Sequence, residues 1–313
     1  MIENFRICFN AVVPIFVYMA VGMAARKAGI LSQKDVLIFN KVAFTVFMSV
    51  NIFRSIYFAD TGTGIDSKLI IFGISGIIAS VLAGLAVSAV MLKDKSKWGV
   101  MIQGIYRPNC ILVGMTIAQA LCPEENMSVV AVLIAATTPI IDALAVLILA
   151  VFNGQEISAK RISKDIITNP LIIGALSALI FLLLRIRLPK SLETTITAMS
   201  NVATPLMLVL LGAFFRFDRL RDNIRLTATA VAFKLVVIPA FTLIPAYLLG
   251  FRGIAFTGLI GLFATANAVA SFPMAQQSGG DTQLAGDIIV VSNTLSLATM
   301  VLWSFLFKTL GAF

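Results

Sequence analysis

Two apolar stretches of this 313-residue chain are interrupted by the same kinds of small and polar residues. The first, 107–119, reads RPNCILVGMTIAQ, and the second, 264–277, reads ATANAVASFPMAQQ. When one is written under the other, Asn109 falls on Asn267 at an offset of 158 residues, about half of the chain. Broken hydrophobic helices at corresponding places in two halves are the sequence indication of a transporter's binding site.

The prolines of these stretches predict where the helices break. A proline inside a helix removes an amide donor and clashes with the preceding turn, which applies to Pro108 and Pro273. Each break leaves a half-helix amino terminus with partial positive charge and free amides, so two such ends meeting at mid-membrane would form a site for an anion. Asn109 and Asn267 could bond the substrate or satisfy the opened backbone. The alternative is that the prolines are kinks and the asparagines bridge helices.

Ionisable residues inside a membrane are rare and are functional candidates by default. Arg107 adjoins the first break, and it is either a counter-charge for a substrate carboxylate or the partner of Asp142 in a scaffold ion pair. Burial favours a neutral carboxyl group, so Asp142 could accept a proton during transport, or it could be permanently paired with Arg107 or Lys234. Lys234 needs a partner, for which Asp142 and Asp287 are the candidates. Arg54 is expected to reach the membrane surface from the end of its helix.

Further polar residues could line a cavity, and each could equally well bond one helix to another. These residues are Asn51, Gln119, Gln277 and Asn293.

Composition identifies the class of protein. The chain is 59% hydrophobic and 12% charged, and its mean hydropathy is +0.99, whereas about a quarter of the residues of a soluble protein are charged. Recurrent apolar runs of about 20 residues predict a multi-spanning helical membrane protein. The chain has no histidine, which excludes histidine relays, histidine metal sites and Ser-His catalysis. Its three cysteines have no metal-binding spacing, so neither a metal nor a cofactor is predicted.

Ten spanning segments follow from the apolar runs, and we expect a multi-pass protein of the cell membrane. The predicted spans are 5–28, 35–58, 67–92, 98–121, 127–152, 166–185, 192–216, 222–249, 252–277 and 282–309. The net charge of +9 resides in short loops, so it indicates membrane topology and not nucleic-acid binding. Alternate loops place thirteen basic residues on one side and seven on the other. The richer side should be cytoplasmic, so both termini are predicted to face outward.

The spans divide into two sets of five. An odd number of spans per repeat requires the second copy to insert upside down. We therefore predict an all-α membrane protein of ten transmembrane helices in two inverted five-helix repeats, with broken helices four and nine crossing each other. The first repeat is predicted over 1–152, a cytoplasmic linker over 153–165 and the second repeat over 166–313.

The pattern of the two breaks resembles the auxin efflux carrier family of membrane transporters. The residues that carry the resemblance are Arg107-Pro108-Asn109 with Gly114, Asn267 with Pro273, and the run 292–299, and the likeness covers essentially the whole chain. The resemblance implies ten spans in inverted repeats, with helices four and nine crossing at their breaks. The family includes plant auxin exporters and bacterial permeases for malate and malonate, and this chain is most similar to the bacterial members.

The chain departs from the family in two places. Met115 and Phe47 stand where family members often have proline. The first break is therefore expected at Pro108 instead.

These features predict a secondary transporter of small organic anions, mono- or dicarboxylates, that works by alternating access in the lipid bilayer. No nucleotide-binding motif is present in the sequence, so ATP is not expected to drive it. The alternative is a sodium- or proton-coupled antiporter or organic-acid symporter that uses Asp142 as its ion-binding acid. An enzyme is disfavoured because no nucleophile–base pair or metal cluster is evident. The oligomeric state is left open, a homodimer included.

Overall fold

The computed structural model describes residues 2–58, 66–122, 125, 127–152, 168–184, 186–215 and 222–313. The predicted linker 153–165 lies outside the described residues. Within the described part, the named elements are helices, and one isolated antiparallel bridge joins Pro108 to Asn267. The prediction of an all-helical chain is therefore confirmed.

The helices of the first half correspond in position to the apolar runs. They are α1 (Ile2–Lys27), α2 (Gln33–Val42), the π-helical turn η1 (Ala43–Met48), α3 (Ser49–Tyr57), α4 (Ser67–Met91), the short η2 (Lys95–Lys97), α5 (Trp98–Tyr106), the π-helical η3 (Cys110–Gly114), α6 (Met115–Leu121) and α7 (Ser128–Phe152). Helices α2, η1 and α3 run on without interruption, whereas α5 and η3 are separated by an extended stretch.

The second half repeats this alternation of continuous and broken helices. Its elements are α9 (Pro170–Leu183), α10 (Lys190–Phe214), α11 (Ile224–Ala232), the π-helical η5 (Phe233–Val237), α12 (Ile238–Leu248), α13 (Gly253–Phe263), α14 (Ser271–Gln277) and α15 (Thr282–Thr309). Among the described residues, 264–270 form the non-helical gap between α13 and α14.

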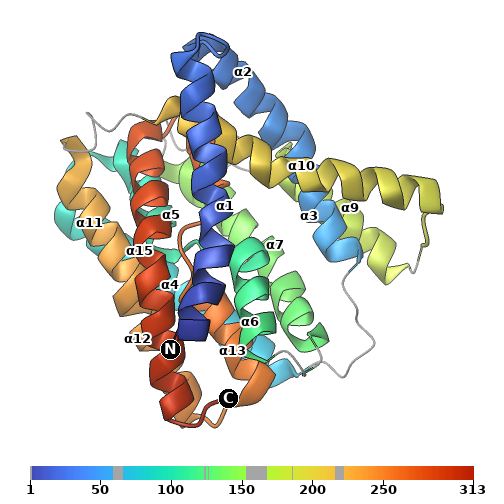
Figure 1. Ribbon diagram of the computed structural model, residues 1–313, viewed down its shortest axis with the longest axis vertical. Coiled ribbons are helices and arrows are strands. Elements are labelled where there is room, and N and C mark those ends of the chain that lie inside the picture. Colours follow the sequence, from blue (N-terminus) through green and yellow to red (C-terminus); the bar gives the residue numbers. More distant parts are fainter. Residues whose placement is uncertain are drawn as a thin grey trace.

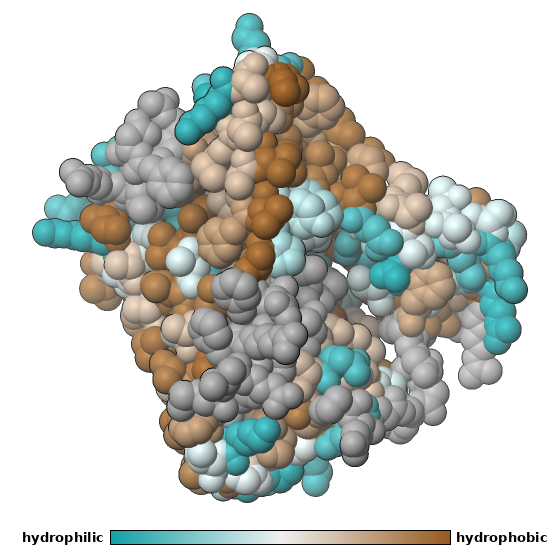
Figure 2. Space-filling view, in the orientation of Figure 1, coloured by the Kyte–Doolittle hydropathy of each residue, from teal (hydrophilic) through white to brown (hydrophobic). Residues whose placement is uncertain are grey.

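Within the described part of the chain, six helices are long and apolar enough to cross a membrane, and shorter apolar helices accompany them. The six are Gln33–Tyr57, Ser67–Met91, Ser128–Phe152, Lys190–Phe214, Ile224–Leu248 and Thr282–Thr309, and each has at least 25 residues. At about 1.5 Å per residue, 25 residues exceed the roughly 30 Å of a bilayer's hydrocarbon core. Large apolar side chains such as Val90 and Leu248 are exposed, and brown apolar residues cover much of the face shown in Figure 2. Such a surface is suited to lipid.

The helices pack into two groups. The small bundle comprises α1, α2, α3, α9 and α10, in which α10 lies against α1 and α3, and α3 lies against α9 (Figure 1). The large bundle comprises α4 to α7 and α11 to α15, with α5 packed on α4, α7 and α15. Fewer elements meet between the bundles, chiefly α1 with α15 and α6. The site described below lies between these two bundles.

Glycine lets α1 and α10 approach backbone to backbone inside the small bundle. A Cβ atom on Gly212 would lie 2.1 Å from the carbonyl oxygen of Met19, and one on Gly22 would lie 1.9 Å from that of Val209. Small residues at such contacts are the usual means by which membrane helices pack closely.

Candidate functional site

The two broken helices meet at a short antiparallel contact, which we call the crossover (residues 107–109 and 264–270). Helix α5 ends at Tyr106, Arg107 is extended, and η3 begins at Cys110. The amide of Asn109 donates to the carbonyl of Ala266 at 3.0 Å, and the amide of Ala268 donates to the carbonyl of Arg107 at 3.3 Å. The opened backbone of each helix is thus satisfied in part by the other, as apolar surroundings require.

Two glycines allow the helices beyond the breaks to touch. A Cβ atom on Gly114 would lie 2.5 Å from the carbonyl oxygen of Gly261, and one on Gly261 would lie 2.8 Å from that of Gly114. Helix α13 packs against η3 and α6, while α14 packs against α5. These two glycines therefore let the two broken helices cross at van der Waals distance.

Asn267 binds the carboxyl end of α5. Its side-chain amide donates to the carbonyls of Gln103 at 2.7 Å and of Arg107 at 3.3 Å. Its backbone amide donates to the hydroxyl of Ser292 at 3.2 Å, and its carbonyl accepts from the side chain of Asn293 at 3.4 Å. The same two carbonyls also accept from the backbone amides of Arg107 and Ala268, so Asn267 adds a second donor to each and ties the end of α5 to the other broken helix.

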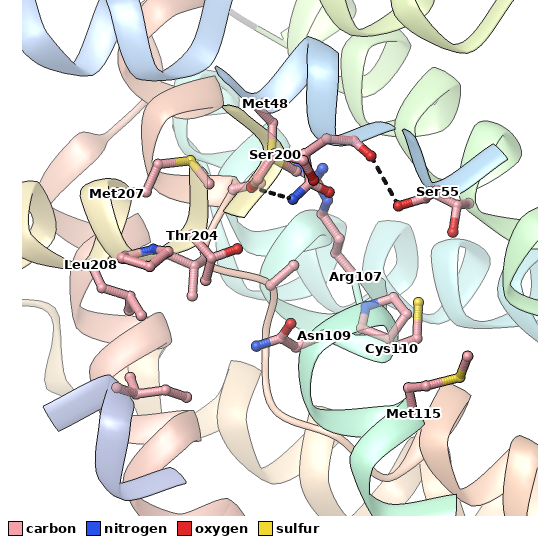
Figure 3. A pocket seen from close by; sticks show the side chains of 18 of the residues that line it. Met48, Ser55, Arg107, Asn109, Cys110, Met115, Ser200, Thr204, Met207 and Leu208 are labelled. Carbon is pink, nitrogen blue, oxygen red and sulfur yellow. Dashed lines mark hydrogen bonds between the residues drawn. The ribbon is translucent and has the colours of Figure 1, made fainter. Parts of the chain in front are cut away.

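A cavity of about 650 Å³ separates the crossover from the small bundle. Residues of α1, α3 and α10 line it on one side, and the crossover and α7 line it on the other (Figure 3). Its polar or charged lining residues are Tyr18, Asn51, Arg54, Ser55, Arg107, Asn109, Thr138, Asp142, Ser200, Asn201 and Thr204. The volume is within the range of small-molecule sites.

Arg107 and Asp142 form a buried ion pair at the cavity wall. The Nη2 atom of Arg107 lies 2.5 Å from Oδ1 of Asp142, and both side chains are almost entirely buried. The Nη1 atom of Arg107 contacts the sulfur of Met274. Of the two predicted roles for Arg107, the structure shows the ion pair, and this pair leaves Arg107 little net charge to offer a ligand.

Asn109 presents an unused donor at the cavity wall. Its Nδ2 atom is buried and has no hydrogen-bond partner among the described residues. Figure 3 shows its side chain across the cavity from Thr204 and Leu208 of α10. A buried amide group without a partner costs free energy, which a bound acceptor would recover.

Arg54, near the end of α3, lies in the cavity wall, a place that was not predicted from the sequence. Its Nε donates to the hydroxyl of Thr197 at 3.4 Å, and its guanidinium lies 5.8 Å from the ring centre of Phe58. Asn51 and Ser55, which are three residues before it and one after it, line the same cavity. Residues at this spacing share a helix face, so the pattern could have been found in the sequence.

Lys234 has neither of the predicted partners, so that prediction is wrong. Its side chain is fully buried, and its Nζ has no hydrogen-bond partner in the described part of the chain. Asp142 is held by Arg107, and Asp287 accepts a hydrogen bond of 2.8 Å from Gln283. The predicted pairings failed because each of the two acids is bonded to another side chain.

The predicted site residues therefore separate into two sets. The cavity brings together Asn51, Arg107, Pro108, Asn109 and Asp142. The residues Asn267, Pro273, Gln119, Gln277, Asn293 and Lys234 are outside its lining. Sequence reasoning missed the lining residues of α10, such as Ser200 and Thr204, because serine and threonine are common in ordinary membrane helices.

We expect Asn267→Leu to destabilise the crossover. The substitution preserves volume but removes two side-chain hydrogen bonds, to the carbonyls of Gln103 and Arg107. Each carbonyl keeps a backbone donor, the amide of Arg107 or of Ala268. At about 0.5–1.5 kcal/mol for each lost bond, we expect a total loss of about 1–3 kcal/mol. Thermal unfolding of the purified variant in detergent would measure the loss. Gln119→Leu, at an exposed position on α6, is the control and should unfold like the wild type. Equal unfolding temperatures for the two variants would contradict the capping role.

Comparison with known proteins agrees with this architecture. The family model described as "Membrane transport protein" matches residues 7–304, a range that contains both breaks and the lining of the cavity. A protein of Methanothermobacter thermautotrophicus described as an uncharacterized transporter is 25% identical over 298 residues, which cover 94% of this chain and 97% of the relative. The predicted resemblance to a family of membrane transporters, the auxin efflux carrier family, is thereby confirmed. A match that extends over both broken helices and nearly the whole length shows that the chain belongs to the membrane transport protein family.

Proposed function

We propose that the chain is a secondary transporter of small organic anions, mono- or dicarboxylates, which bind in the cavity beside the crossover. The observation that carries the proposal is the side chain of Asn109 in the cavity wall, whose buried Nδ2 donor has no partner in the described part of the chain. A carboxylate is an acceptor only, so it complements an unused donor at this position.

The charge of the cavity supports an anion. Among the described residues of its lining, the charged ones are Arg54, Arg107 and Asp142, which leave one net positive charge. Because Asp142 is bonded to Arg107, the excess positive charge belongs to Arg54 on the opposite wall. A cavity in a low-dielectric protein focuses such a charge and raises the local concentration of anions.

The arrangement of the helices supports alternating access. The cavity lies between the two bundles, so a movement of one bundle against the other would change which side it opens to. At one end, the side-chain amide of Asn40 in α2 donates to Gln276 in α14, which joins the small bundle to the large one. In the outward-facing arrangement that we propose, this contact closes the cytoplasmic side.

We further propose that the chain crosses the cell membrane ten times, as two inverted five-helix repeats with both termini outside. In support, the helical elements agree with the ten predicted segments to within a few residues, and the fourth and ninth segments are the ones with extended breaks. The two breaks also pair in antiparallel fashion, as two inverted copies would.

Asn109→Ala tests the anion site. Losing a hydrogen bond to a charged group costs about 1.5–3 kcal/mol, so KM for a carboxylate should rise about tenfold or more. The purified protein in liposomes, assayed with radiolabelled malonate and pyruvate, would measure this. Because the side-chain Nδ2 of Asn109 has no partner among the described residues, its removal should leave the protein folded. Gln119→Ala, outside the cavity, is the control.

Two results would count against the proposal. Unchanged KM in Asn109→Ala would remove Asn109 from the site. Wild-type flux no greater than that of empty liposomes, for every carboxylate tried, would remove the proposed substrate class.

A further inference from the structure

We propose that Arg54 is a second substrate-contacting residue, which binds the second negative group of a dianion whose first carboxylate is held at Asn109. This inference rests on the proposed function and deepens it, because it makes Arg54 the residue that discriminates dianions from monoanions.

The position of Arg54 is set by the face that α3 turns toward the cavity. Asn51, Arg54 and Ser55 all line the cavity, as positions i, i+3 and i+4 of one helix face do. The Asn51 amide donates to the carbonyl of Ser200 at 3.2 Å, and the Ser55 hydroxyl donates to the carbonyl of Asn51 at 2.9 Å, as dashed lines in Figure 3 show. The neighbours of Arg54 on this face are thus bonded to protein groups.

Arg54 has no acidic partner in the described part of the chain. No described carboxylate oxygen lies within 4.0 Å of it, whereas Arg107 in the same cavity is 2.5 Å from Asp142. The carboxylate one helical turn before Thr197, that of Glu193, instead accepts from the hydroxyl of Tyr57 at 3.0 Å. The recorded contacts of Arg54 are neutral, a threonine hydroxyl and the Phe58 ring.

A guanidinium group in this position has donors to spare. Arginine carries five N–H donors, and the hydrogen bond to Thr197 uses the Nε donor. The terminal nitrogens can therefore bind a carboxylate in the planar, two-bond manner that arginine favours. A half-buried cation without an anion beside it is costly in a membrane protein, so a role in binding an anion explains why it is placed here.

The two proposed contacts come from different bundles. Asn109 belongs to the crossover in the large bundle, and Arg54 belongs to α3 in the small bundle. A dianion held at both would bridge the bundles, whereas a monoanion held at Asn109 would touch chiefly one. Bound dianion should therefore favour the arrangement in which the two walls are close, since a ligand shifts an equilibrium by its differential affinity for the two states.

The experiment compares a dianion with a monoanion of similar size, malonate and pyruvate, in uptake by liposomes that contain the purified protein. Arg54→Gln should raise KM for malonate about tenfold to 100-fold, while KM for pyruvate changes by less than about threefold. Arg54→Lys keeps the positive charge but loses the two parallel donors of the guanidinium group, so its KM for malonate should lie between those of the wild type and Arg54→Gln. Lys41→Gln, which removes an exposed cation of α2 outside the cavity, should leave both values unchanged.

The outcomes separate the two proposals. Equal losses for malonate and pyruvate in Arg54→Gln, with normal flux in Arg54→Lys, would overturn the role of Arg54 as the second contact and leave the proposed function intact. No malonate effect in either variant would overturn it as well. A wild type that carries neither substrate above empty liposomes would overturn the proposed function, and this inference with it.

Discussion

Gly114→Ala is expected to abolish transport and to destabilise the protein by about 3 kcal/mol, the upper range for overpacking. The added methyl group would lie 2.5 Å from the carbonyl oxygen of Gly261 and 3.0 Å from its Cα atom. These are backbone atoms of a crossing helix, so no side-chain rotation can relieve the clash. The helices must separate, and the hydrogen bonds of the crossover from Asn109 to Ala266 and from Ala268 to Arg107 would be strained.

A matched glycine in the same bundle provides the control. In Gly286→Ala of α15, the nearest atom to the new Cβ is Cδ1 of Leu211 at 3.6 Å, an ordinary contact. This variant should unfold at or slightly above the wild-type temperature, because alanine is favoured over glycine in a helix by up to about 1 kcal/mol. Thermal unfolding in detergent and carboxylate uptake in liposomes would be measured for both. A Gly114→Ala protein with normal stability and flux would show that the crossing is not as tight as described.

The positions of the helices could largely be predicted from the sequence, because apolar runs and prolines determine the local structure of the chain. The apolar runs marked the helices, and Pro108 marked the first break, where Arg107 is extended. The second break was predicted near Pro273, but Pro273 lies inside α14, and the non-helical stretch is 264–270. Small residues before a proline can open the backbone while the proline itself occupies an early helical turn, where its missing amide costs little.

The candidate site was harder to predict from the sequence, because it depends on the orientation of polar side chains in the folded protein. Asn109 and Asn267 are equivalent in the aligned stretches, yet the side chain of Asn109 lies in the cavity wall with an unpaired amide, whereas the side-chain amide of Asn267 bonds the end of α5. Local sequence cannot distinguish these two arrangements, since both place an asparagine side chain beside an opened helix, and the surrounding helices decide whether its amide finds an acceptor. The pairing of Lys234 was wrong, and the place of Arg54 in the cavity wall was not foreseen, for a related reason: the surroundings of a long cationic side chain are set by helices far away in the sequence.

Asp142→Ala is expected to have the largest effect on stability, a loss of about 3–5 kcal/mol, because it leaves the buried guanidinium of Arg107 unpaired. The double variant Arg107→Met, Asp142→Leu replaces the pair by apolar groups of similar size, and it should regain most of the lost stability, since a buried pair is often no better than such a replacement. Thermal unfolding of the single and double variants would measure the coupling between the two residues.

A second ion pair in the same bundle calibrates the effect. Lys97 and Asp281 lie 3.3 Å apart, but their side chains are 33% and 21% exposed. Such a pair contributes about 0–1 kcal/mol. Asp281→Asn removes the charge and retains a good amino-terminal cap for α15, where Asp281 accepts from the amide of Leu284. If Asp142→Ala were as mild as Asp281→Asn, the buried pair would not be a structural element.

Transport assays of Arg107 and Asp142 variants distinguish an ion-coupled carrier from the anion carrier that we propose. In an ion-coupled carrier, Asp142 must exchange Arg107 for sodium or a proton in each cycle, so Asp142→Asn should abolish the dependence of flux on a sodium or pH gradient. In the anion carrier that we propose, the pair stays closed and holds the scaffold, so the stable double variant should keep its carboxylate uptake and show no change in gradient dependence. Arg107 is bonded to Asp142 at 2.5 Å, whereas the side-chain Nδ2 of Asn109 has no partner among the described residues. We therefore expect gradient dependence to be unchanged.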